Sequence, residues 1–124
     1  MSQRVLIVED QEDNRAILRD LLTNAGYDFI EATNGEEGVA LAESERPDLI
    51  LMDIQLPVMD GYEATRRIKG NAALRSIPII AVTSYALSGD EAKAQNAGCD
   101  AYVAKPFSPR QLLAKIREYL LPGV

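Results

Sequence analysis

Histidine is absent from this chain of 124 residues, and cysteine occurs only once, at position 99. The absence of histidine excludes histidine-based acid–base catalysis, histidine metal sites and any role as a phosphohistidine donor. A single cysteine excludes an internal disulfide bond. Because Cys99 follows Gly98 in a predicted helix-to-strand turn, we expect it to be a small, partly buried packing residue.

Long apolar runs are also lacking. None approaches the roughly 18 residues that a membrane span needs, and the start of the chain lacks the pattern of a signal peptide. The formal net charge is -6, without a visible cluster of basic residues. Nucleic acids and anionic membranes would repel such a surface. We therefore expect a cytoplasmic protein that binds neither.

What the chain does contain is typical of an ordinary globular protein. Hydrophobic residues make up 47% and charged residues 26% of the sequence. A chain of this length usually forms one domain and buries roughly two thirds of its unfolded surface. We expect one domain over residues 1–124.

Short apolar runs rich in branched residues recur along the chain, separated by segments with helical spacing. They are Val5–Val8, Leu49–Met52 and Ile79–Val82, with a weaker run at Ala101–Val103. This alternation predicts a parallel β-sheet with connecting helices. Because the first three runs are almost continuously apolar, both faces of the sheet should be covered by helices.

A fifth strand is needed between Asp10 and Asp53, because that interval exceeds one crossover of about 30 residues. The segment Tyr27–Ala32, with sequence YDFIEA, alternates and carries two acids, which favours an edge strand. Five strands joined by right-handed crossovers predict an α/β, three-layer, doubly wound sandwich of the flavodoxin-like type. Its expected strand order is 2-1-3-4-5.

Three helices can be placed from their apolar residues. The first ends before Gly26, and the last begins after Ser108 as N-cap with Pro109 at its first position. The remaining helix of these three, Gly89–Ala97, has only alanines to bury, so we expect it to be weakly held and movable. The expected buried residues are Ile17, Leu18, Leu21, Leu22 and Ala25; Ala92, Ala94 and Ala97; and Leu112, Leu113, Ile116 and Leu120.

Polar residues follow these apolar runs at the predicted carboxyl ends of the strands. In this topology the first, third, fourth and fifth strands are neighbours, so the residues should converge on one shallow cleft. They are Glu9 and Asp10, Asp53, Thr83 with Ser84, and Lys105 before Pro106.

Three carboxylates this close together repel one another unless a cation neutralises them. All-oxygen ligands select a hard divalent cation, magnesium or its close relative manganese, which would keep some waters and bind a phosphate oxygen. Lys105 would add a second positive charge. A carboxylate can attack phosphorus to form an acyl phosphate when metal and lysine neutralise the transferring group.

Four motifs give the chain a family resemblance: VLIVED at 5–10, LILMDIQLPVMDG at 49–61, AVTS at 81–84 and YVAKPFS at 102–108. In this order and spacing, over essentially the whole chain, they resemble the receiver domain of two-component response regulators. The resemblance implies a phosphorelay switch rather than an enzyme. Such a switch assists its own phosphorylation and dephosphorylation, with phosphohistidine of a sensor kinase or phosphotransferase as the donor.

By this resemblance Asp53 is the phosphoryl acceptor. Glu9, Asp10, Asp53 and the backbone carbonyl of Gln55 are implied to hold the magnesium ion, with Glu9 able to reach it through water. Lys105 is implied to contact the phosphoryl group.

The resemblance also implies a switch. Thr83 would move its hydroxyl toward the new phosphate, and Tyr102 would turn inward behind it. The Lys105–Pro106 bond is implied to be cis, although such bonds are trans by default.

Two residues beside Thr83 depart from common family choices. Ser84 stands where alanine or glycine is frequent, and Tyr85 is bulky and near the path of attacking water. We expect Tyr85 and Gln55 to shield the acyl phosphate and lengthen its lifetime.

The output surface is expected to run from Thr83–Tyr85 to Asp100–Tyr102, on the face of the fourth helix, fifth strand and fifth helix, and to bind a downstream protein. The AGCDAYVAKP stretch is similar to stand-alone regulators of the division-control and chemotaxis type. We therefore expect a monomer or weak dimer without an output domain. The alternative is a receiver cut from a hybrid histidine kinase or larger regulator.

Two other classes fit less well. A flavin-binding flavodoxin-like redox domain would need a neutral phosphate loop, whereas the first loop reads EDQEDN. An aspartyl phosphohydrolase would carry a second acid two residues after Asp53, where this chain has Gln55.

Overall fold

Five parallel strands form one sheet in a computed structural model that describes residues 3–83 and 90–120. The strands are β1 (Arg4–Val8), β2 (Asp28–Ala32), β3 (Leu49–Asp53), β4 (Ile79–Thr83) and β5 (Ala101–Ala104). The helices are α1 (Glu12–Asn24), α2 (Gly35–Glu45), α3 (Gly61–Gly70), α4 (Asp90–Ala97) and α5 (Pro109–Tyr119). The sheet order is β2-β1-β3-β4-β5, so the predicted topology is confirmed.

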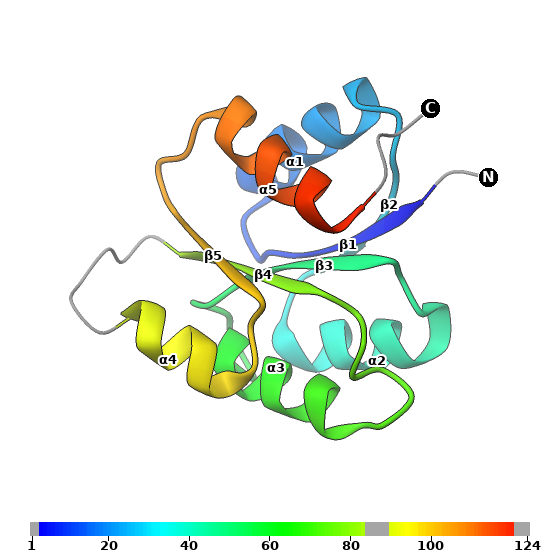
Figure 1. The fold of residues 1–124 in the computed structure, drawn as a ribbon, viewed down its shortest axis with the longest axis vertical. Helices are drawn as coiled ribbons and strands as arrows, with labels where there is room; N and C mark the ends of the chain where they lie inside the picture. Colours follow the sequence, from blue (N-terminus) through cyan, green and yellow to red (C-terminus); the bar gives the residue numbers. More distant parts are fainter. Residues whose placement is uncertain (1–2, 84–89, 121–124) are drawn as a thin grey trace.

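The helices lie in two layers, with α1 and α5 on one face of the sheet and α2, α3 and α4 on the other (Figure 1). The predicted three-layer sandwich is thereby confirmed. The strand register aligns the carboxyl ends: Val8 pairs with Met52, Asp53 with Val82, and Thr83 with Ala104. One edge of the sheet therefore gathers the residues that follow β1, β3, β4 and β5.

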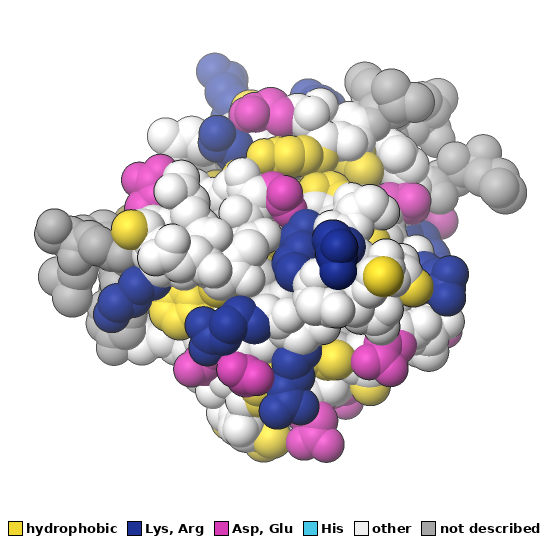
Figure 2. Space-filling model, turned by 60° about the horizontal axis from the view of Figure 1, so that its bottom comes forward, with side chains coloured by type: hydrophobic (Ala, Val, Ile, Leu, Met, Phe, Trp, Pro, Cys, Tyr) yellow, Lys and Arg dark blue, Asp and Glu magenta, His cyan; other side chains and the backbone are white. Residues whose placement is uncertain are grey.

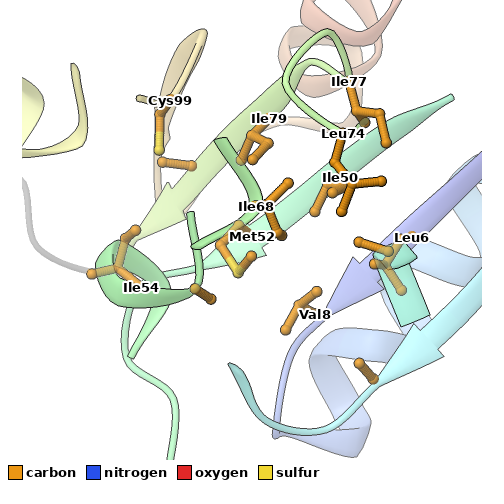
Figure 3. Packing of buried hydrophobic residues seen from close by; sticks show 14 of the residues in the cluster. Leu6, Val8, Ile50, Met52, Ile54, Ile68, Leu74, Ile77, Ile79 and Cys99 are labelled. Carbon is orange, nitrogen blue, oxygen red and sulfur yellow. The ribbon is translucent and has the colours of Figure 1, made fainter. Parts of the chain in front are cut away.

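Each face of the sheet has its own apolar core. Successive strand residues point to opposite faces, so a run such as VLIV supplies both cores at once. Figure 3 shows the core beneath α2, α3 and α4, where Leu6, Val8, Ile50, Met52 and Ile79 form one cluster with Ile68 of α3. The other core includes Val5, Ile7, Leu49, Leu51 and Ile80. The predicted double-sided burial of these strands is correct.

The edge strand β2 is wetter than its neighbours, as predicted. Asp28 is exposed, the three residues after it are half-buried, and Ala32 is buried. The strand starts at Asp28, one residue later than predicted. Tyr27 instead packs its buried ring into the core beneath α1 and α5, because it directly follows the end of α1 and Gly26.

Along α1, the burial of Leu18, Leu21 and Leu22 is confirmed, and Ala25 packs partly buried against the same core. The prediction that Ile17 is buried is wrong, because its side chain is 53% exposed. Ile17 lines a groove of about 430 Å³ between α1 and residues 105–107.

The start of α5 follows the predicted pattern. Ser108 Oγ accepts a hydrogen bond from the Gln111 N–H at 3.0 Å, and the Gln111 side chain accepts from the Ser108 N–H at 3.2 Å, completing a capping box. Leu112, Ile116 and Leu120 are buried, and Leu113 is partly buried.

Helix α4 buries two of its three alanines. Ala94 and Ala97 are buried, whereas Ala92 is exposed, so that part of the prediction is wrong. Ala92 is two residues from Ala94 and points away from it on a helix. So small a buried face is in keeping with the weak attachment expected of this helix, whose movement stays a prediction.

Cys99 is a packing residue at the end of α4, as expected. It is buried, and its thiol donates to Thr65 Oγ1 at 3.7 Å. Burial raises the pKa of the Cys99 thiol.

The face of the molecule formed by α2, α3 and α4 carries charges of both signs. Figure 2 shows Lys and Arg side chains interspersed with Asp and Glu on the side where α2, α3 and α4 lie. Within residues 3–83 and 90–120, no helix is long and apolar enough to cross a bilayer.

Candidate functional site

Three carboxylates meet at the carboxyl edge of the sheet. Glu9 and Asp10 directly follow β1, and Asp53 is the last residue of β3. One ligand oxygen from each lies within 4.8 Å of the others. The predicted convergence of these acids is confirmed, and the ammonium group of Lys105 joins them from beyond β5.

Glu9 is held from two sides and is only 1% exposed. Its Oε1 accepts a hydrogen bond from Lys105 Nζ at 2.9 Å, and its Oε2 accepts one from the Gln11 N–H at 3.0 Å. Burial acts to raise the pKa of Glu9, but these two hydrogen bonds and the charge of Lys105 hold it below its ordinary value. These contacts therefore favour the ionised form of Glu9.

Asp53 is also buried, with 6% exposure, but has weaker partners. Its Oδ2 lies 3.6 Å from Lys105 Nζ, and its Oδ1 accepts a hydrogen bond from the Gln55 N–H at 3.3 Å. Burial and the negative charge of Glu9 raise the pKa of Asp53 to about 7, against the opposing charge of Lys105. One ammonium group does not balance three carboxylates.

The loop after β3 brings the backbone of Gln55 beside Asp53. At the end of this loop, Gly61 allows the start of α3 to lie against the Asp53 backbone, because a Cβ at position 61 would lie 2.2 Å from the carbonyl oxygen of Asp53. The Gly61 N–H donates to the Ile54 carbonyl at 2.9 Å, and Asp60 Oδ1 caps α3 by accepting from the Glu63 N–H at 2.9 Å.

The tip of the same loop is a tight turn. The Met59 N–H donates to the Pro57 carbonyl at 2.7 Å, and Val58 between them has φ of 70° and is 76% exposed. A branched residue with positive φ is uncommon, and such strain gathers at functional sites. The sequence reasoning did not identify this turn.

The predicted switch residues lie on the neighbouring strands β4 and β5. Thr83 ends β4 and is buried, and Tyr102 of β5 is half-buried against the core beneath α2, α3 and α4. Ser84 and Tyr85, the two other residues predicted near this position, lie outside the described residues. The cis peptide bond between Lys105 and Pro106 is present, as predicted.

Two contacts around Glu9 were not predicted. One is the Gln11 N–H on its carboxylate, and the other is Arg15 Nη1, which donates to the Glu9 backbone carbonyl at 2.9 Å. An arginine one turn into a helix carries no signal of such a contact, because charged residues on helices usually face solvent.

This arrangement suits a hard cation. Carboxylate and carbonyl oxygens are the donors that magnesium and manganese prefer, and the described cluster offers three carboxylates within reach of one ion. A bound cation would oppose the two causes that raise the pKa of Asp53, its burial and the charge of Glu9, and would favour the ionised carboxylate, which is the nucleophilic form.

Comparison with known proteins agrees with the site. Residues 5–117 match the family described as the response regulator receiver domain. The chain is 48% identical to the polar-differentiation response regulator DivK of Brucella anthropi and 46% identical to that of Brucella ovis. Each match spans 97% of this chain and 98% of the relative.

Solved structures give the same result. The receiver domain of a Pseudomonas aeruginosa sensor histidine kinase, with a magnesium ion coordinated in its active-site cleft, is 39% identical with a TM-score of 0.89; 96% of this chain and 98% of that one are covered. The Vibrio cholerae chemotaxis protein CheY4 is 28% identical with a TM-score of 0.90, over 97% and 100% of the two chains. The chain belongs to the response regulator receiver domain family, whose members act in phosphorelay signalling.

Proposed function

We propose that Asp53 accepts a phosphoryl group from a phosphohistidine in a magnesium-dependent reaction. The observation that carries this proposal is the cluster of Glu9, Asp10 and Asp53 within 4.8 Å, with Lys105 Nζ beside two of its members. The family works with kinases or phosphotransferases as donors and with downstream targets.

Glu9, Asp10, Asp53 and the backbone carbonyl of Gln55 would hold the ion. When bound, it would neutralise the carboxylates and the phosphate oxygens. The magnesium ion in the cleft of the Pseudomonas receiver supports this assignment.

Asp53 is the best placed of the acids to be the nucleophile. Glu9 is committed to Lys105 and the Gln11 N–H, and Asp10 is only half-buried at the rim. In the reaction an Asp53 oxygen forms a bond to phosphorus, the phosphorus–nitrogen bond breaks, and its electron pair stays on the imidazole of the donor. Lys105 balances the charge of the transferring oxygens.

The acyl phosphate would then act on the rest of the domain. The Thr83 hydroxyl would turn toward the phosphate, Tyr102 would turn inward, and the face of α4, β5 and α5 would bind a downstream protein. The half-buried position of Tyr102 between core and surface supports this route. Tyr85 and Gln55 would slow hydrolysis, so Tyr85→Ala should dephosphorylate faster; an unchanged rate would refute this role.

The central proposal is tested by weighing the protein after incubation with acetyl phosphate, with and without magnesium. Wild type should gain one phosphoryl group only with magnesium, and Asp53→Asn should gain none. Asp13→Asn is the matched control, because Asp13 is an exposed acid in the first turn of α1, outside the cluster. Equal labelling of wild type and Asp53→Asn would refute the assignment.

A further inference from the structure

The loop between β1 and α1 carries two of the three carboxylates in only three residues, 9–11. Its junction with α1 lacks a common support. Gln11, the N-cap of α1, makes no side-chain capping hydrogen bond within the described residues, whereas Asn34, Asp60 and Ser108 cap α2, α3 and α5. Something else must therefore hold the loop in place.

Arg15 supplies that support. Its Nη1 donates a 2.9 Å hydrogen bond back to the carbonyl of Glu9, across the start of the helix. The Arg15 side chain is only 13% exposed and Glu9 is 1% exposed, so water does not readily replace this bond. The Glu9 N–H in turn donates to the Ala32 carbonyl of β2 at 3.0 Å. Both backbone polar groups of Glu9 are thus fixed.

Arg15 is itself fixed by a closed ring of charges. Its guanidinium binds Glu12 and, at 3.3 Å, Glu31 of β2. Arg19 closes the ring, at 2.7 Å from Glu31 and 2.7 Å from Glu12. Two arginines balance two glutamates, and the ring joins α1 to the edge strand. Because the glutamates balance its charge, the Arg15 guanidinium contributes a fixed orientation to its surroundings more than a net positive charge.

We propose that Arg15 is a positioning residue for the metal site: through the Glu9 carbonyl it orients the carboxylates of Glu9 and Asp10 for the cation. This inference rests on the proposed magnesium site. Groups that hydrogen-bond to metal ligands fix ligand geometry, and losing one typically weakens metal binding 10- to 100-fold.

Charge alone predicts the opposite sign. Removing the Arg15 cation would make the cleft more negative and would tighten magnesium binding. Weaker binding by an arginine-to-neutral variant therefore distinguishes positioning from electrostatics. Arg19 is the matched control, because it belongs to the same ring and carries the same charge but does not contact Glu9 among its described bonds.

The experiment titrates magnesium chloride into wild type, Arg15→Met, Arg15→Lys and Arg19→Met by calorimetry, with urea unfolding of each metal-free protein. Arg15→Met should raise the magnesium Kd about tenfold, and Arg15→Lys, which keeps one donor for the Glu9 carbonyl, should recover part of the loss. Arg19→Met should stay within about twofold of wild type.

Three results would overturn the inference. One is an Arg15→Met Kd equal to or tighter than that of wild type. The second is an equal loss in Arg15→Met and Arg19→Met, which would assign the effect to the stability of the whole ring. The third, no binding by wild type, would also overturn the proposed magnesium site. If Arg15→Met does not fold, Arg15→Lys carries the test. Its magnesium Kd must then be higher than that of the control variant Arg19→Met.

Discussion

Two lysines hold opposite ends of the sheet with similar local geometry. At the carboxyl edge, Lys105 is 18% exposed and lies 2.9 Å from Glu9; at the amino edge, Lys69 is 16% exposed and lies 2.9 Å from Asp100. Their surroundings differ. Lys69 meets one carboxylate and the carbonyls of Arg75 and Ile77, whereas Lys105 meets a cluster of three carboxylates.

We propose that the difference separates an ion pair that stabilises the fold from one that takes part in the chemistry. Around Lys69 the charges balance, and Asp100 also accepts from the Ile79 N–H at 2.8 Å, so the group joins the loop after α3 to the starts of β4 and β5. Around Lys105 negative charge is in excess, and the pKa of Asp53 rises to about 7. Excess charge of one sign marks a site that awaits a ligand.

The largest expected effect is the loss of phosphorylation in Lys105→Met. Removing one preorganised charge from a site of this kind typically slows the reaction about 100-fold or more. Labelling by acetyl phosphate at saturating magnesium, followed by intact mass, gives the rate. Lys69→Met is the control and should react at the wild-type rate. Similar slowing in both variants would contradict the proposal that only the lysine at the carboxyl edge contributes to phosphorylation.

Lys69→Met, in contrast, should have the larger effect on the stability of the fold. Lys69→Met removes three hydrogen bonds and leaves Asp100 without its cation, which should cost about 1–3 kcal/mol of the free energy of unfolding. Urea unfolding measures this cost. Lys93→Met is the control, since the described part of the chain offers Lys93 no ion pair and its side chain is exposed. Equal stability of the two variants would contradict the structural role of Lys69.

A third prediction concerns pH. The pKa of Asp53 is raised on folding, so this group lowers the stability of the metal-free protein as pH rises from about 4 to 7, and its full cost remains above pH 7. Asp53→Asn removes this cost and should be more stable than wild type by about 1–2 kcal/mol at pH 8, after allowance for solvent screening.

Urea unfolding at pH 8 and pH 5 tests this difference. The gap between Asp53→Asn and wild type should shrink at pH 5, where Asp53 is largely protonated, and should also shrink at pH 8 when magnesium is added. A gap that is independent of pH would show that the charge of Asp53 is not its source.

The smallest expected effect lies at the rim of the Lys69 group. Tyr119 is 39% exposed and donates through its hydroxyl to the Asp100 carbonyl at 3.0 Å. Tyr119→Phe should cost about 0.5 kcal/mol in urea unfolding, because water replaces an exposed hydrogen bond at little cost. Its phosphorylation rate should not change. A slower rate would mean that the amino edge also affects the chemistry.

The sheet and the acid cluster could be predicted because both depend on local pattern and topology. Runs such as Val5–Val8 must be buried on both faces, and topology then brings Glu9, Asp53 and Lys105 to one edge. Small boundary errors, such as the start of β2 at Asp28, come from the flanking turn.

The rest depends on how separate elements approach each other. Ile17 fits the apolar stripe of α1, but no helix or strand among the described residues covers it. Ala92 is exposed because only part of the surface of α4 packs against the sheet. The contacts of Arg15 with Glu9 and of Lys69 with Asp100 join residues whose pairing no local spacing reveals.

Gly61 has a consequence for engineering. Its missing Cβ lets the first turn of α3 lie directly against the carbonyl of Asp53, where any larger residue would collide with the backbone at 2.2 Å. Transplanting this cleft into another scaffold of alternating strands and helices would therefore require the glycine together with the aspartate, the two acids and the lysine. A graft of the charged residues alone would push α3 outward and open the cleft to water.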